Sequence, residues 1–191
     1  MSSLPVFHTP RLILKAIAET DTPAYEKHFV DYEVIRQLAD AVPWPYPEGG
    51  IIEFIKGTIL PNQGQDKWDW GIFLAANSSE LIGGIGLRRE GKPGHRGFWL
   101  GRAFWGRGYM TEAVEPIIDY AFTELGFERL LFDNALGNIK SRRVKEKTGC
   151  RFLRVEPARF VDPAYREREF WELSREDWRA HKKLRHAAVD P

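Results

Sequence analysis

The chain has 191 residues, of which 43% are hydrophobic and 29% are charged, a composition typical of one globular domain. A chain of this length buries roughly 70% of the surface that its unfolded form exposes, so it can fold without disulfides or metals. Its formal net charge of +1 excludes an overall electrostatic attraction to nucleic acid or to anionic lipid.

The single cysteine excludes an internal disulfide and suits a reducing compartment. No basic segment followed by a long apolar run stands at the start, as a secretory signal would require. No stretch contains the roughly 18 apolar residues that span a bilayer. We therefore expect a cytoplasmic protein.

The N-terminal third predicts a strand, a helical region and an aromatic loop. Residues 11–17 have the pattern of a strand, and Asp21-Thr22-Pro23 has the capping residues and the proline that begin a helix. Residues 24–40 follow a helical pattern. The three prolines of residues 43–47 break the chain into a loop, and residues 48–58 predict a short helix.

Strands dominate the remaining sequence, which also contains two longer helices. The predicted strands are 68–75, 81–87, 96–102, 130–133, 151–155 and 168–173, with a turn at 77–79 between the first two. The predicted helices are 109–125 and 138–147. This order predicts a mixed sheet with helices on both faces. We assign the domain to residues 1–178 and expect a polar C-terminal tail at 179–191.

A glycine turn connects the strand 96–102 to the helix that follows. Gly106 and Gly108 lack Cβ atoms, so the backbone can approach a ligand closely. The first N–H groups of a helix have no partner within it, and the helix dipole favours an anion there. The turn is therefore a candidate phosphate-binding site.

The spacing of these glycines excludes two well-known phosphate-binding motifs. A dinucleotide-binding fingerprint requires a third glycine where Thr111 stands, and the chain contains no Gly-Lys-Ser/Thr of a P-loop. Two glycines in this spacing also occur in turns that serve only the backbone. The turn is therefore either a phosphate site of another kind or a purely structural turn.

A second candidate segment is the helix that begins at Asn138 and carries Ser141 three residues later, so that both side chains share one face. An amide there can bind amide groups of a ligand, and a hydroxyl one turn later can donate a proton to a leaving group. In the structural alternative, Asn138 is an N-cap and Ser141 completes the first turn. Arg142, Arg143 and Lys145 form a solvated face or neutralise a phosphate, and spacing alone leaves both possibilities open.

Together these segments resemble the GNAT superfamily of N-acetyltransferases, most closely its ribosomal-protein alanine acetyltransferase-like (RimJ/RimL) branch. The resemblance covers most of the chain. Its most specific motifs are Trp105-Gly106-Arg107-Gly108-Tyr109-Met110-Thr111-Glu112-Ala113 and Asn138-x-x-Ser141 with Glu146-Lys147-x-Gly149. Further matches are Thr9-Pro10-Arg11-Leu12-Ile13-Leu14, Gly97-Phe98-Trp99 and Trp171-Glu172-Leu173.

The resemblance implies a single-domain α+β fold of the GNAT type, with helices on both faces of a twisted, mixed and mostly antiparallel sheet that is splayed between its fourth and fifth strands. It also implies acetyl-CoA as co-substrate in the gap and no metal. By position, backbone N–H groups of residues 106–110 hold the pyrophosphate, Asn138 binds the pantetheine arm, and Ser141 lies near the thioester sulfur. The acetyl-CoA-binding residues expected in this way are Leu100, Arg102, Trp105, Gly106, Arg107, Gly108, Tyr109, Met110, Thr111, Asn138, Ser141 and Arg143.

The expected reaction is direct attack of a primary amine on the thioester in a ternary complex. The acceptor is the α-amine of a protein N-terminus or a small-molecule amine. His95 is the first candidate for the general base because the ordinary pKa of histidine lies near neutrality, and a surface histidine is the alternative. Asp69 and Glu33 are further candidates that would act through water. Ser141 is the candidate acid for the departing thiolate. An acetyl-enzyme on Cys150 requires an activating neighbour that the sequence does not indicate, which favours core packing.

The acceptor pocket is expected to combine the early helices, the 43–47 loop and the first strand after it. Its predicted residues are Trp44, Tyr46, Trp68, Asp69 and Trp70, whose rings surround an aliphatic amine or, alternatively, fill the core.

Two other functional classes remain. A CoA-binding regulatory module without catalysis would keep the glycine turn and Asn138 but acetylate no amine. A nucleic-acid-binding role for the basic segment 140–147 is disfavoured by the near-neutral charge. We expect acetyl-CoA and an amine acceptor as partners, no nucleic acid or membrane, and a monomer or homodimer.

Overall fold

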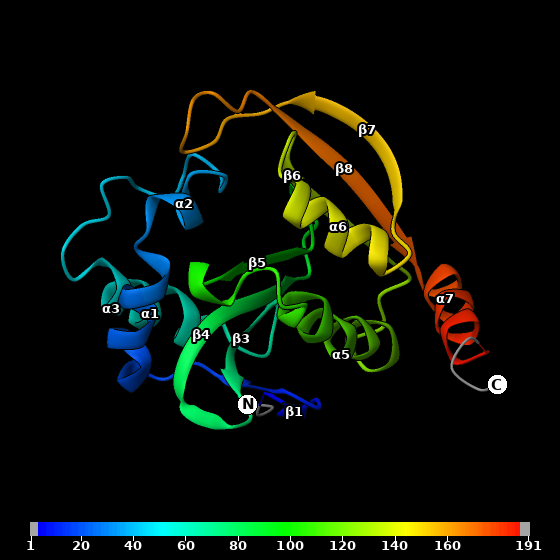
Figure 1. Ribbon diagram of the computed structural model, residues 1–191, viewed down its shortest axis with the longest axis horizontal. Coiled ribbons are helices and arrows are strands. Elements are labelled where there is room, and N and C mark those ends of the chain that lie inside the picture. The colour runs from blue at the N-terminus through cyan, green and yellow to red at the C-terminus, as the bar shows by residue number, and fades with distance from the viewer. Residues whose placement is uncertain (1–3, 188–191) are drawn as a thin grey trace.

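The strands of the computed structural model, which describes residues 4–187, form two antiparallel sheets (Figure 1). The larger sheet, in the order β1-β2-β3-β4-β5, contains Phe7–His8, Leu12–Ala16, Lys67–Leu74, Asn77–Arg88 and Arg96–Leu100. The smaller sheet, in the order β6-β8-β7, contains Arg129–Ala135, Glu167–Ser174 and Arg151–Pro157. All pairings between these strands are antiparallel, which agrees with the predicted fold class.

Helices occupy the connections between the strands. Those before β3 are η1 (Glu19–Asp21), α1 (Thr22–Phe29), α2 (Tyr32–Ile35), α3 (Gly50–Phe54), the π-helical η2 (Ile55–Ile59) and α4 (Leu60–Asn62). Those after β5 are η3 (Arg102–Phe104), α5 (Tyr109–Thr123), α6 (Ile139–Lys147) and α7 (Arg175–Ala187). In Figure 1, α1 and α3 lie on one side of β4 and α5 lies on the other.

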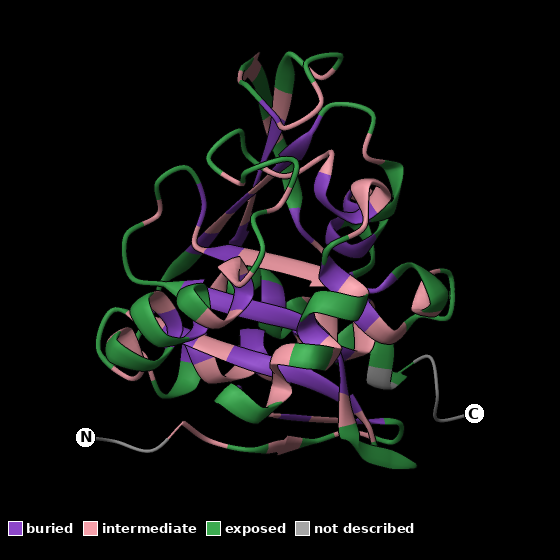
Figure 2. Ribbon diagram, turned by 90° about the vertical axis from the view of Figure 1, so that its left-hand side faces the viewer, coloured by how far each residue is buried: buried purple, intermediate pink, exposed green. Residues whose placement is uncertain are grey.

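Strand β3 shows how side-chain alternation divides the core. Trp68, Trp70 and Ile72 are buried in the cluster that includes α5, whereas Phe73 is buried in the cluster that includes α1 and α3. Successive residues of a strand point to opposite faces, although a bulge interrupts the register near Phe73. The central strands are accordingly buried between two layers of helices (Figure 2).

The two sheets diverge between β5 and β6, where no ladder pairs the strands of the described chain. His95 joins them at one end. Its backbone N–H donates to the carbonyl oxygen of Leu131 at 2.8 Å, and its Nδ1 accepts from the N–H of Leu131, also at 2.8 Å. The opening between the sheets therefore begins next to His95, and residues of β5 line it.

Two local predictions were wrong. The helix predicted for 24–40 is interrupted because Asp31 takes an extended conformation and its carboxylate caps a new helix, α2, by accepting from the N–H of Glu33. The turn predicted at 77–79 lies earlier, since Leu74 already pairs with Asn77 across a two-residue connection.

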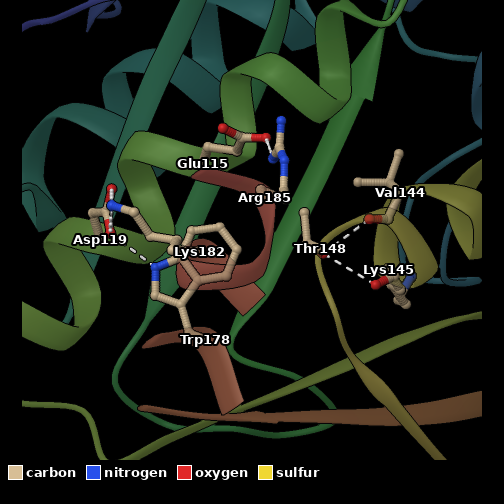
Figure 3. Close-up of polar contacts among 8 residues, drawn as sticks. All are labelled: Glu115, Asp119, Val144, Lys145, Thr148, Trp178, Lys182 and Arg185. Carbon is tan, nitrogen blue, oxygen red and sulfur yellow. Dashed lines mark hydrogen bonds and ion pairs between the residues drawn. The ribbon is translucent and has the colours of Figure 1, made fainter. Parts of the chain in front are cut away.

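The polar tail predicted from residue 179 is also corrected, because residues 175–187 form helix α7. Trp178 is only 3% exposed, and its indole N–H donates to Asp119 of α5 at 2.8 Å. Lys182 pairs with the same carboxylate at 2.9 Å, and Arg185 pairs with Glu115 (Figure 3). The domain therefore extends past the predicted boundary at residue 178, and residues 188–191 lie outside the described chain.

Candidate active site

A cavity of about 850 Å³ lies where the two sheets diverge. Its walls combine Phe98 of β5, Phe132 of β6, the N-terminus of α5 and the face of α6 that carries Ser141. It continues to α1, α2 and the loop that follows α2. The cavity thus joins the predicted acetyl-CoA site to the predicted acceptor side.

The glycine turn opens helix α5 with the geometry expected from the sequence. Gly106 and Gly108 have φ values of +75° and +79°, which favour glycine, and Gly108 is the N-cap. The helical hydrogen bond from the N–H of Glu112 to the carbonyl of Gly108 leaves the amides of 109–111 without helical acceptors. Since Gly106, Gly108 and residues 109–111 line the cavity, these donors are available to an anion bound there.

Arg11 holds this turn in place, a contact that sequence reasoning missed. Its Nη1 donates to the carbonyl of Arg107 at 2.9 Å, its Nε donates to Glu112 at 2.7 Å, and its guanidinium stacks on the ring of Tyr109. Thr9 also donates to Glu112, at 2.6 Å. Burial acts to raise the pKa of Glu112, but the hydrogen bonds from Thr9 and Arg11 outweigh it and hold this pKa below its ordinary value. The only indication of this contact in the sequence was the resemblance of Thr9-Pro10-Arg11 to the opening strand of the family.

Asn138 and Ser141 both line the cavity at the start of α6. Asn138 is the N-cap, and its Oδ1 accepts from the N–H of Ser141 at 3.1 Å, so the structural reading of this pair is correct. Its amide NH₂ group remains as a donor toward a ligand. Ser141 is 9% exposed, and its hydroxyl accepts a hydrogen bond from Lys145 at 2.8 Å.

Basic residues on α6 divide between the cavity and the protein. Lys140, Arg143 and Lys147 line the cavity, and the ammonium of Lys140 lies 3.7 Å from the ring centre of Trp105. Arg142 instead pairs with the buried carboxylate of Glu169. Of the three cations considered from the sequence, Arg143 thus remains a candidate to neutralise a phosphate, whereas Arg142 is paired and Lys145 is buried.

Among the remaining predicted cofactor residues, Leu100 and Trp105 line the cavity, and the indole N–H of Trp105 donates to the carbonyl of Leu100 at 2.7 Å. Arg102 and Arg107 do not line it. The guanidinium of Arg102 lies 3.6 Å from Asp31, and Arg107 offers its carbonyl to Arg11.

Asp69 is the carboxylate that the structure brings to the cavity from β3. Burial raises its pKa, against the opposing effect of the nearby cations Arg88 and Lys67. Gly86 lies opposite on β4, and a Cβ atom there would collide with Oδ1 of Asp69, so this glycine makes room for the carboxylate. Gln63 fixes the backbone by donating to the carbonyl of Asp69 and accepting from its N–H.

The structure places His95 away from the predicted role of general base. Its ring does not line the cavity, packs edge-on against Phe127 and accepts from Leu131 through Nδ1. Burial lowers its pKa. Glu33 does line the cavity, 3.6 Å from Arg36, with a side chain 43% exposed. Cys150 is buried, and burial raises the pKa of its thiol, as core packing requires.

The aromatic acceptor wall is only partly present. Tyr46 lines the cavity and packs edge-on against Phe29. Trp44 is 41% exposed and lies against Tyr32 outside the cavity lining. Trp68 belongs to the core with α5, and so does Trp70, whose buried indole donates to Pro5 although part of the residue borders the cavity. Strand alternation separates Asp69 from both tryptophans.

The diverging sheets, the glycine turn and the polar face of α6 line one cavity. The chain matches the acetyltransferase (GNAT) domain family over residues 11–151, and it belongs to this family. It is an N-acetyltransferase.

Proteins that are similar to this chain in sequence or in structure are also named as acetyltransferases. The Bacillus subtilis protein YdaF, whose name provisionally calls it a ribosomal N-acetyltransferase, is 35% identical over 133 residues, 65% of this chain and 72% of its own. The FsC-acetyl coenzyme A-N(2)-transacetylase of Aspergillus fumigatus is 27% identical over 91% of this chain and 78% of its own. The fold also matches RimL, a ribosomal alpha-N-protein acetyltransferase solved with coenzyme A. The TM-score is 0.74, with 17% identity over 89% of this chain and 98% of that one.

Two further observations concern residues 4–187. None of the helices in this range combines the length and the hydropathy that a membrane-spanning segment needs. No group of three or more His, Cys, Asp or Glu side chains is arranged to hold a metal ion.

Proposed function

We propose that this chain transfers the acetyl group of acetyl-CoA to a primary amine by direct attack in a ternary complex, and that α-amines are its preferred acceptors. The observation that carries the proposal is the row of free amides at the start of α5, which faces the same cavity as Asn138 and Ser141. These donors suit a pyrophosphate and a pantetheine arm. Acetyl-CoA supplies the activated acyl group, and residues of this chain orient it and move protons.

The preference for α-amines follows from acid–base chemistry and from the names of relatives. An α-amine has an ordinary pKa of about 7.7–8.0, against about 10.4 for a lysine, so it reaches its nucleophilic form with less help from a base. YdaF and RimL are both named for ribosomal N-acetylation. The β7–β8 loop pairs with the segment after α2 through Ala39 and Phe160, and both residues line the part of the cavity where we propose that the amine binds (Figure 1).

The test is acetyl transfer from acetyl-CoA to a panel of amines, measured as release of free thiol. We expect peptides with a free N-terminus to be acetylated and the same peptides with a blocked N-terminus and an internal lysine to react far more slowly. Polyamines, aminoglycosides and free amino acids complete the panel. Binding of acetyl-CoA without transfer to any amine would instead establish the non-catalytic CoA-binding module.

Asp69 replaces His95 as the proposed general base, since it lies in the cavity and its raised pKa suits it to accept a proton. We expect Asp69→Asn to lower kcat about 100-fold, the lower range for general acid–base catalysis, and to remove the carboxylate's contribution to the pH–rate profile. Asp66→Asn, which removes an exposed carboxylate three residues earlier, is the control and should leave kcat unchanged. Equal rates for both variants would exclude Asp69 as the base.

A further inference from the structure

A buried lysine stands behind the hydroxyl of Ser141. Lys145 is 1% exposed and follows Ser141 by one helical turn, and its Nζ donates to Oγ of Ser141 at 2.8 Å. None of the ion pairs found among residues 4–187 includes Lys145, although the charge of Asp133 acts on it. A lysine is almost never fully buried unless it is paired, so its position calls for a functional explanation.

The groups around Lys145 come from every element packed against it. Arg96 of β5 is 5% exposed, and none of its three guanidinium nitrogens has a hydrogen-bond partner within residues 4–187. Arg96 lies on the ring of Phe132, at 4.1 Å. Asp133 of β6 and the thiol of Cys150 also act on the charge of Lys145. The floor of the cavity is therefore rich in positive charge, a setting that favours a developing anion.

The hydrogen bond has a direction that matters for chemistry. The ammonium form of lysine is a donor only, so Ser141 Oγ accepts from protonated Lys145. The hydroxyl hydrogen of Ser141 is then free to point to another acceptor. Both residues line the cavity, so such an acceptor can be an atom of a bound substrate.

We propose that Lys145 and Ser141 form a proton relay to the sulfur that leaves the thioester, an inference that rests on the proposed function. As the carbon–sulfur bond breaks and its electron pair moves to sulfur, Ser141 Oγ gives its proton to the thiolate. Lys145 gives a proton to Oγ at the same time and is left neutral. The proton lost by the attacking amine goes to the base or to water, and Lys145 regains its proton from water in the cavity.

The acidity of Lys145 supports this role. Burial, with a further contribution from the charge of Arg96, lowers its pKa to about 7, whereas Asp133 and Cys150 act in the opposite direction. An ammonium with this pKa can release a proton near neutral pH, which an ordinary lysine does poorly.

The first test compares steady-state rates of Lys145→Met, Ser141→Ala and the double variant. Methionine keeps the length of the side chain in a buried site, so the fold should persist, and thermal unfolding will verify it. We expect each single variant to lose at least about tenfold in kcat with KM for acetyl-CoA changed less than about threefold. The double variant should be no slower than the slower single one, because residues of one relay are not additive. Lys183→Met, an exposed lysine on α7, is the control.

The pH dependence of kcat separates proton donation from mere positioning. The wild type should lose activity as pH rises through the range in which Lys145 loses its proton, and Lys145→Met should lack this decline. Additive losses in the double variant, or a decline that survives in Lys145→Met, would overturn the relay.

A readout without turnover completes the test. In ¹³Cε-lysine-labelled protein without substrate, one lysine signal, absent from Lys145→Met, should titrate about three pH units below the others. Titration with the other lysines would overturn the proposal. A failed relay can be told apart from a failed proposed function. If the relay alone is absent, the wild type still acetylates amines; if the proposed function is wrong, the wild type transfers no acetyl group to any amine.

Discussion

A Gly108→Val variant is expected to lose at least about 100-fold in affinity for acetyl-CoA, since each charge-assisted hydrogen bond from the turn contributes about 1.5–3 kcal/mol. Gly108 has a φ of +79° and lines the cavity as the N-cap of α5. A branched side chain there disfavours the backbone conformation that aims the amides and stands in the path of the phosphates. Isothermal titration with acetyl-CoA measures the loss.

The control for this variant is Gly126→Val. Gly126 has a similar φ of +71°, lies just beyond the other end of α5 and has open space where a Cβ would stand. A valine at this position imposes comparable backbone strain outside the cavity. Both variants should therefore lose similar stability, while only Gly108→Val loses affinity for acetyl-CoA. Unchanged affinity in Gly108→Val, or an equal loss in Gly126→Val, would show that the turn does not hold the co-substrate.

Lys145→Met is expected to be more stable than the wild type at pH 6, with the difference shrinking as pH rises. The folded protein holds the pKa of Lys145 at about 7, against an ordinary value of 10.5. Between these values the unfolded chain binds more protons at this site than the folded chain, so the wild type gains unfolding free energy as pH rises through this window. Below pH 7 both states are protonated, and the full cost of the buried charge remains.

The expected change in the difference between the two proteins is about 3 kcal/mol from pH 6 to pH 9.5, at about 1.36 kcal/mol per pKa unit. Urea unfolding at several pH values measures the free energy of unfolding of each protein. Subtracting one value from the other at each pH removes the contribution of the titratable groups that both proteins share. Lys183→Met, which removes an exposed charge, should follow the wild type. If the free energy of unfolding changed with pH in the same way for the wild type and Lys145→Met, the ammonium of Lys145 would not be desolvated in the folded protein.

The strand–turn–helix around Gly106 and Gly108 and the start of α6 at Asn138 were predictable from the sequence. Positive φ values, free helix amides and N-caps are consequences of neighbouring residues, and the structure has all three. The same local rules placed most strands within a few residues. They erred at residue 31, where one capping carboxylate began a second helix.

The positions of His95, Asp69 and Lys145 depend on contacts that local patterns do not contain. His95 joins the two sheets because Leu131, 36 residues later, lies beside it. Asp69 reaches the cavity while Trp68 enters the core, because the partners of β3 decide which face is covered. The charged residues around Lys145 in the sequence are typical of a solvated helix face. In the structure, however, Lys145 is buried and lies within reach of the charge of Arg96.

The sequence by itself therefore determined the glycine turn and the helix that follows it, since these depend on backbone conformations that a few adjacent residues impose. Its motifs also resemble the family to which the chain belongs. Only the tertiary structure decided the candidate base, the buried lysine and the place of α7 in the domain. Those depend on which distant elements exclude water from a given side chain, and burial sets both its pKa and its chemistry.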